Sequence, residues 1–250
     1  MRYYILILIL CLSTTTNAQI LNAESLRKVT DTSGFSGATT LEFALKRTTN
    51  DFLVLSSDIH LQYKTKKHLA LFKNDIKFQK IEGEKFENSG ISHLRYNYRF
   101  VPNIAWEAFL QGQYNKVSLI DFRGLFGIGP RFKLTKLENY KSYLGTLLMY
   151  EYEEIDDGVT PIQRDIRGSI YASFSLFPTK NLSLISTTYY QPKLSQFGDY
   201  RISSQSSLLI DIIEKLAFSI KYTFTYDSFP AESIPNSQYD FATGIAYSFD

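Results

Sequence analysis

The chain has 250 residues, 44% of them hydrophobic and 21% charged, which is enough for one sizeable domain. Its 27 Lys and Arg nearly balance 25 Asp and Glu, and no basic or acidic block is present. This composition argues against a nucleic-acid partner and against a charged tail. The 18 Tyr and 19 Phe stand against one Trp, a composition typical of β-strands and membrane interfaces.

Residues 1–18 have the three parts of a cleavable signal peptide. Arg2 supplies a positive charge, Tyr4 to Leu12 form an apolar run, and Thr16-Asn17-Ala18 are small residues suited to cleavage. The apolar run is far short of the roughly 20 residues that span a bilayer as a helix. A removed signal peptide is therefore favoured over an uncleaved anchor.

The expected mature chain starts at residue 19 and has no cysteine, because the only one, Cys11, lies in the signal peptide. We therefore expect neither a disulfide nor a cysteine metal site. Residues 19–33 are polar, carry mixed charge and lack a period of two. They are interpreted as a short periplasmic lead-in.

From residue 34 to residue 250, apolar and polar side chains alternate between turn signals. This pattern predicts an all-β fold: a single antiparallel up-and-down transmembrane β-barrel of about twelve strands, after a cleaved signal peptide. The segments are long enough to cross a bilayer when tilted. The predicted strands cover residues 34–47, 52–63, 68–81, 89–100, 104–116, 121–135, 142–155, 165–177, 182–194, 200–212, 215–227 and 238–250.

The last strand shows the alternation most clearly. One face carries Tyr239, Phe241, Thr243, Ile245, Tyr247 and Phe249, and the other carries Asp240, Ala242, Gly244, Ala246 and Ser248. We expect the aromatic face to meet lipid and the small face to leave room for long side chains of neighbouring strands.

The connections differ between the two ends of the predicted barrel. If the C-terminus is periplasmic, the short turns at 64–67, 101–103 and 177–181 are periplasmic, and the longer loops at 155–164 and 228–237 are outside. Segment 68–81 is the least regular, because Leu69 and Leu71 are out of phase with Ile76 and Phe78. A bulge at 73–75 is predicted to restore the phase.

Charged side chains share one face of most predicted strands. An Arg or Lys facing lipid at mid-membrane costs roughly 2–4 kcal/mol, so this segregation, together with the strand length, favours a membrane barrel over a soluble lipocalin-like one. We interpret the polar face as a lumen network of ion pairs and hydrogen bonds. Its candidate members are His93, Arg95, Arg99, Glu107, Gln111, Gln113, Arg123, Arg131, Glu151, Glu153, Asp165 and Arg167.

These residues allow two other interpretations. A ligand or ion path is less favoured than a structural network, because buried charges are costly unless paired and the signs nearly balance. An enzyme is not expected either: Ser92 and His93 face opposite ways, and His60 shares a face with Asp58 but has no obvious serine partner. No metal-ligand spacing and no cofactor motif is present.

Five runs carry a family resemblance: Tyr63-Lys64-Thr65-Lys66-Lys67, His93-Leu94-Arg95-Tyr96-Asn97-Tyr98, Trp106-Glu107-Ala108-Phe109-Leu110-Gln111-Gly112-Gln113, Arg123-Gly124-Leu125-Phe126-Gly127-Ile128-Gly129-Pro130-Arg131 and Ala246-Tyr247-Ser248-Phe249. They resemble the outer-membrane family called domain of unknown function 481, or YdiY-like. The resemblance implies a monomeric outer-membrane barrel of unestablished role, with some members associated with salt stress. It implies no catalytic residues.

These observations predict a non-catalytic structural or envelope-stress protein in the outer membrane of a Gram-negative cell. A narrow channel or binding barrel for ions or small solutes is the alternative. The expected partners are outer-membrane lipid, lipopolysaccharide and the barrel-assembly machinery; no nucleic acid is expected.

Overall fold

The computed structural model describes residues 33–47, 51–81, 87–135, 137, 139–231 and 234–249. The predicted signal peptide, the lead-in before Ser33 and the terminal Asp250 lie outside these ranges.

Twelve strands and one short 3-10 turn make up the described chain. The strands are β1 (Gly34–Arg47), β2 (Asp51–Lys64), β3 (His68–Ile81), β4 (Glu87–Val101), β5 (Ile104–Asn115), β6 (Ile120–Lys133), β7 (Tyr140–Ile155), β8 (Gln163–Thr179), β9 (Leu182–Lys193), β10 (Gln196–Ile213), β11 (Leu216–Asp227) and β12 (Ser237–Phe249). The turn η1 (Lys116–Ser118) joins β5 to β6. All twelve predicted strands are confirmed, with ends that differ by at most four residues.

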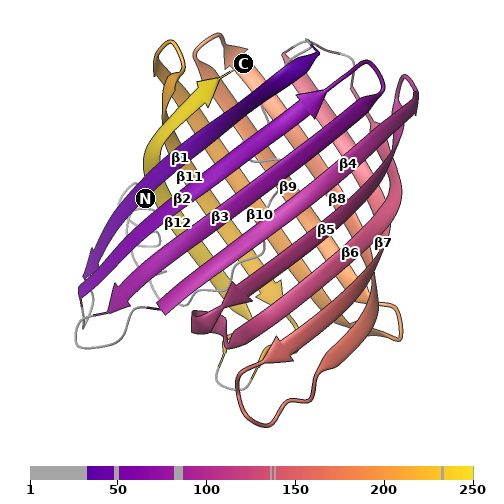
Figure 1. Cartoon of the computed structure of the whole chain (residues 1–250), viewed down its shortest axis with the longest axis vertical. Coiled ribbons are helices and arrows are strands. Elements are labelled where there is room, and N and C mark those ends of the chain that lie inside the picture. Colours follow the sequence, from indigo (N-terminus) through magenta and orange to yellow (C-terminus); the bar gives the residue numbers. More distant parts are fainter. Residues whose placement is uncertain are drawn as a thin grey trace, which may run out of the picture.

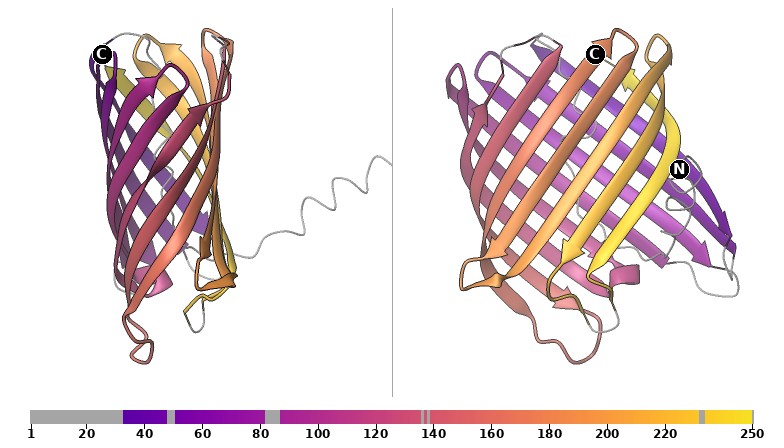
Figure 2. Two further views of the ribbon diagram at one scale, coloured as in Figure 1. Left: turned by 90° about the vertical axis from the view of Figure 1, so that its right-hand side faces the viewer. Right: turned by 180° about the vertical axis from the view of Figure 1, so that it is seen from behind.

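The strands form one closed antiparallel barrel in chain order. The seam is the pairing of β1 with β12, which runs from Gly37 opposite Phe249 to Glu42 opposite Gly244. Closure leaves no free sheet edge along this paired stretch. The strands are steeply tilted, and the barrel is flattened, as the broad view of Figure 1 and the narrow left-hand view of Figure 2 show.

The two ends of the barrel differ in their connections. The short turns β2–β3, β4–β5, β8–β9 and β10–β11 lie at the same end as the start of β1 and the end of β12, the upper end in Figure 1. We call this the proximal end. The longer β7–β8 loop lies at the opposite, distal end.

Side-chain burial follows the predicted alternation. The outer wall is apolar: Leu41, Phe72, Leu94, Leu110, Phe126, Leu148, Ile170 and Phe241 are all exposed. The buried side chains inside are largely polar or charged. Such an inside-out pattern is expected where lipid replaces water around the wall.

The predicted bulge in the third strand is wrong. Strand β3 keeps an unbroken register with both β2 and β4. Leu69 and Leu71 are buried on the same face as Lys73 and Asp75, while Ile76 and Phe78 face outward. The apparent change of phase arises because two leucines point into the lumen near the proximal end.

Of the described residues, only the three in η1 are helical, and no described helix is long and apolar enough to cross a membrane.

Candidate functional site: the barrel lumen

A carboxylate on β7, Glu151, is fully buried and lies among three arginines. Arg123 Nε donates to its Oε2 at 3.0 Å, Arg167 Nε to its Oε1 at 3.0 Å, and Arg201 Nη1 to its Oε1 at 2.7 Å. Glu153 takes part as well, accepting from Arg201 Nη2 at 2.8 Å. We call these five residues the Glu151 cluster.

The Glu151 cluster reaches beyond neighbouring strands. Arg201 lies on β10, with β8 and β9 between it and Glu151 on β7. Arg201 Nε also pairs with Asp227 at 2.6 Å, and Arg167 Nη1 with Asp199 at 2.8 Å. Each arginine is therefore held by at least one carboxylate, as buried charges require.

A second group lies nearer the proximal end. It consists of Glu107, Arg95, Arg131 and Tyr171, and we call it the Glu107 cluster. Glu107 Oε2 accepts a hydrogen bond from Tyr171 Oη at 2.8 Å, and it lies 3.4 Å from Arg131 Nη1 and 3.5 Å from Arg95 Nη1. Arg95 on β4 also donates to Tyr189 Oη on β9 at 3.4 Å. This last contact joins opposite walls of the flattened barrel, because β5 to β8 lie between the two strands along the sheet.

A third group lies beside the seam. It consists of Lys221, Glu42, Asp75, Lys73 and Asp58, and we call it the Lys221 cluster. Lys221 on β11 pairs with Glu42 on β1 at 2.8 Å and lies 3.8 Å from Asp75 on β3. Lys73 pairs with Asp58 at 3.1 Å.

The contact between Glu42 and Lys221 passes over the small face of β12. A Cβ added at Gly244 would lie 2.8 Å from Glu42 Cγ and 2.4 Å from the carbonyl oxygen of Leu41. The expectation that the small residues of the last strand leave room for long neighbours is confirmed at this position.

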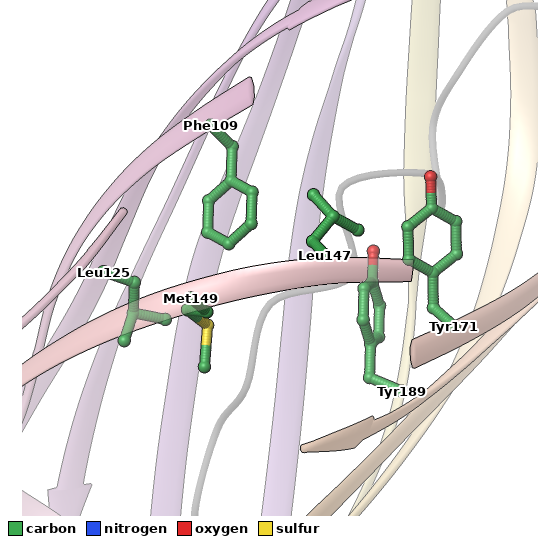
Figure 3. Close-up of a cluster of buried hydrophobic side chains, with 6 residues drawn as sticks. All are labelled: Phe109, Leu125, Leu147, Met149, Tyr171 and Tyr189. Carbon is green, nitrogen blue, oxygen red and sulfur yellow. The ribbon is translucent and has the colours of Figure 1, made fainter. Parts of the chain in front are cut away.

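An apolar patch fills the middle of the lumen. It consists of Phe109, Leu125, Leu147, Met149, Tyr171 and Tyr189, which gather from β5 to β9 (Figure 3). Glycines accommodate two of its rings: a Cβ at Gly127 would lie 2.2 Å from the Phe109 ring, and one at Gly145 2.1 Å from the Tyr171 ring. The void beside the patch measures about 20 Å³, close to the roughly 10–15 Å³ that one water needs.

At the distal end, the β7–β8 loop contains a carboxylate that is held by local hydrogen bonds. The carboxylate of Asp157, in the β7–β8 loop, accepts hydrogen bonds from the Thr160 hydroxyl and from the Val159 and Thr160 backbone N–H groups. These bonds lower the pKa of Asp157. A lowered pKa in the folded state means that ionised Asp157 stabilises the loop near neutral pH, and that this contribution is lost as the pH falls through the folded pKa.

The structure places the predicted site residues at different depths. Arg95, Glu107, Arg123, Arg131, Glu151, Glu153 and Arg167 are buried in the Glu151 and Glu107 clusters described above. His93 Nδ1 lies 2.9 Å from Gln111 Oε1, Gln111 donates to Gln113 at 2.7 Å, and Asp165 pairs with Lys193 at 2.8 Å. Arg99 lies elsewhere: it is exposed at the proximal end, where it donates to the carbonyl of Lys66.

Several lumen residues were not among the predicted candidates. Arg201, Asp199 and Asp58 lie on strands whose inward residues are otherwise mostly small or neutral, so charge alternation was weak there. Glu42 was missed because its partner Lys221 lies on a non-adjacent strand. Lys73 was missed because it lies in the segment that was predicted to bulge, although its partner Asp58 is on the neighbouring strand. The sequence signal that could have revealed these residues is that Asp58 shares a strand face with His60, and Lys73 with Asp75.

The candidates for catalysis are dispersed. Ser92 is on the outer face and His93 is inside. His60 is buried beside the Lys221 cluster, and His68 Nδ1 lies 2.6 Å from Tyr96 Oη at the proximal end. The described residues contain no group of three or more His, Cys, Asp or Glu arranged to hold a metal ion.

Comparison with known proteins identifies the family. Residues 30–249 match the family described as "Protein of unknown function, DUF481". The chain belongs to this family. No curated protein sequence matches it significantly.

This DUF481 chain shares its architecture with solved outer-membrane barrels. The structure of the NanC porin matches with a TM-score of 0.55 at 8% identity, covering 85% of this chain and 100% of that one. The COG4313 outer membrane channel from Pseudomonas putida F1 also gives 0.55 at 8% identity, covering 92% and 100%. At such low identity the likeness concerns the fold, which is that of outer-membrane β-barrels.

Proposed function

We propose that this DUF481 protein is a non-catalytic outer-membrane barrel whose lumen is closed by ion pairs, and that its role is structural or in envelope stress. The observation that carries the proposal is the set of contacts between non-adjacent strands. Arg201 reaches from β10 to β7, Arg95 from β4 to β9, and Lys221 from β11 to β3.

These contacts occupy the lumen at three depths. Cationic and carboxylate side chains are nearly matched in the Glu151 and Lys221 clusters, so these charges are neutralised by one another rather than by a solute. The apolar patch fills the space between them and leaves a void of about 20 Å³. A hydrated ion would have to displace buried, paired side chains to pass.

A narrow channel is the second candidate function, and one observation favours it. The two similar structures described above are a porin and an outer-membrane channel. Recordings of the purified protein in planar bilayers separate the two functions. Stable conductance steps in the unaltered protein support the channel, whereas a folded, heat-modifiable and silent barrel supports closure.

The absence of catalysis is proposed on the dispersed arrangement of His60, His68, His93 and Ser92. Nucleophilic catalysis requires a nucleophile and a base within hydrogen-bond reach. Incubation of the pure protein with phospholipid and lipopolysaccharide tests this point. Turnover that is lost in His60→Ala or His93→Ala variants would make the protein an enzyme.

The location and partners are proposed together with the function. The apolar outer wall is suited to contact with lipid and lipopolysaccharide. Because the protein is a closed barrel of twelve strands, we expect the barrel-assembly machinery of a Gram-negative cell to be a partner. We expect a monomer whose mature N-terminus is Gln19. Fractionation of the cell envelope followed by N-terminal sequencing checks both the location and the cleavage.

A further inference from the structure

The seam between β1 and β12 is held differently in its two halves. Backbone pairing covers Gly37–Glu42 and Gly244–Phe249. Beyond this stretch β1 continues to Arg47 in register with β2, and residues 237–243 of β12 stay in register with β11. Both strands are therefore intact, yet they diverge toward the distal end (Figure 2, right-hand view). In the described part of the chain, the distal half of the seam lacks the backbone ladder that closes the proximal half.

Ion pairs inside the lumen cross the seam at this point. Lys221 on β11 pairs with Glu42 on β1 at 2.8 Å, and Lys77 on β3 pairs with Asp240 on β12. Lys77 and Glu42 lie in one row of the sheet, because both are opposite Ser56 on β2. Each ion pair therefore joins the β1–β3 side of the seam to the β11–β12 side. We call Glu42, Lys221, Lys77 and Asp240 the seam latch.

The exposure of the seam latch differs from that of neighbouring lumen residues. Asp240 is on the lumen face of β12, but its side chain is partly exposed, whereas Thr223, opposite it on β11, is buried. Gln238 is buried on the same face although it lies nearer the distal end of β12. The exposure of Asp240 is therefore not explained by the end of the barrel. It places the latch beside the point where the wall is open.

We propose that the distal half of the seam is a lateral gate in the barrel wall, and that the seam latch limits its opening. A backbone ladder opens only when several hydrogen bonds break together, whereas two ion pairs can break without unfolding either strand. Attraction between opposite charges on the two sides of the seam draws the strands together. In the proposed membrane orientation the gate lies on the side of the outer leaflet. It concerns the side wall, whereas the proposed function concerns the axis of the lumen.

The test measures how fast a small water-soluble maleimide modifies a cysteine placed in the lumen beside the latch. Thr223→Cys supplies this cysteine in the full mature protein, reconstituted into phosphatidylcholine nanodiscs, and the expected mature chain has no other cysteine. We expect slow modification while the latch is intact. Lys77→Asp replaces the attraction to Asp240 with repulsion and should raise the rate about tenfold or more.

A charge swap separates a latch from a general disturbance of the wall. Lys77→Asp/Asp240→Lys restores opposite charges and should return the rate to within about threefold of that with the latch intact. Lys77→Gln removes the attraction without adding repulsion, so its rate should be intermediate, and it serves as the second variant if Lys77→Asp does not fold. Heat-modifiability checks folding in each case. A charge swap that is modified as fast as Lys77→Asp would overturn the latch.

The matched control is a lumen cysteine away from the seam. Ser173 lies on β8 and, like Thr223, is a small buried hydroxyl residue. Modification of Ser173→Cys should be unaffected by Lys77→Asp. An unchanged rate at Thr223→Cys, or equal acceleration at the two cysteines, would overturn the gate. Because the measurement is chemical modification rather than conductance, a conducting barrel would contradict the proposed function without deciding this test.

Discussion

Glu151 is the carboxylate on which three buried arginines converge. Arg123, Arg167 and Arg201 all donate to it, so its removal would leave charges in the lumen with fewer partners. Truncating one partner of a buried ion pair typically costs about 3–5 kcal/mol. We predict that Glu151→Gln lowers the free energy of unfolding by an amount in this range, measured by urea unfolding in lipid vesicles.

Glu154 provides the control for that measurement. It lies three residues further along β7 on the opposite face, where it accepts a hydrogen bond from Tyr152 at the surface. Glu154→Gln should change stability by less than about 1 kcal/mol. Similar losses in the two variants would show that the Glu151 cluster contributes no special stability.

Gly145 is constrained by a ring rather than by a charge. A Cβ there would lie 2.1 Å from the Tyr171 ring, whereas a Cβ at Gly168 would make ordinary contacts at 3.7 Å. We predict that Gly145→Ala destabilises the barrel by about 1–3 kcal/mol through overpacking and that Gly168→Ala is close to neutral. Thermal unfolding followed by heat-modifiability compares the two, and a neutral Gly145→Ala would contradict the packing described for the patch.

At the scale of elements, the seam is the weakest part of the wall. In the described pairing, β1 and β12 are joined only between Gly37–Glu42 and Gly244–Phe249, while β7 and β8 pair from Tyr140 to Glu153. Residues 238–243 of β12 therefore pair with β11 alone. We predict faster amide hydrogen exchange in 238–243 than in 244–249, measured by mass spectrometry in detergent. Equal protection along β12 would contradict a partly open seam.

The sequence allowed the strands to be predicted but not all of their partners. Alternation and turn residues placed all twelve segments, because the lipid-facing side of each strand must be apolar along its length. The bulge at 73–75 was wrong because the same rule does not forbid apolar residues inside: Leu69 and Leu71 face the lumen. The charged faces of β4 to β7 were evident because their polar residues are large and regularly spaced.

Which side chains pair across the lumen depends on the cross-section of the barrel. The alternation within a single strand carries no information about that cross-section. Arg201 was missed although it occupies an inward position, because that face of β10 continues beyond it with the neutral residues Ser203, Gln205 and Ser207. Its partners lie on β7, and only the flattened shape brings these strands within reach.

For the whole molecule, the central claim is that paired side chains close the lumen. The contact between Arg95 and Tyr189 joins the two broad walls at mid-height, next to the apolar patch. Replacing both with alanine removes the contact between the walls and enlarges the void there, while leaving the outer wall and the strand pairing in place.

Planar-bilayer conductance of the unaltered protein and of Arg95→Ala/Tyr189→Ala tests this claim most directly. Both proteins should first be shown to be folded by heat-modifiability. The closed-lumen account predicts a silent unaltered barrel and stable conductance steps from the double variant. Steps of the same size from both proteins would contradict it.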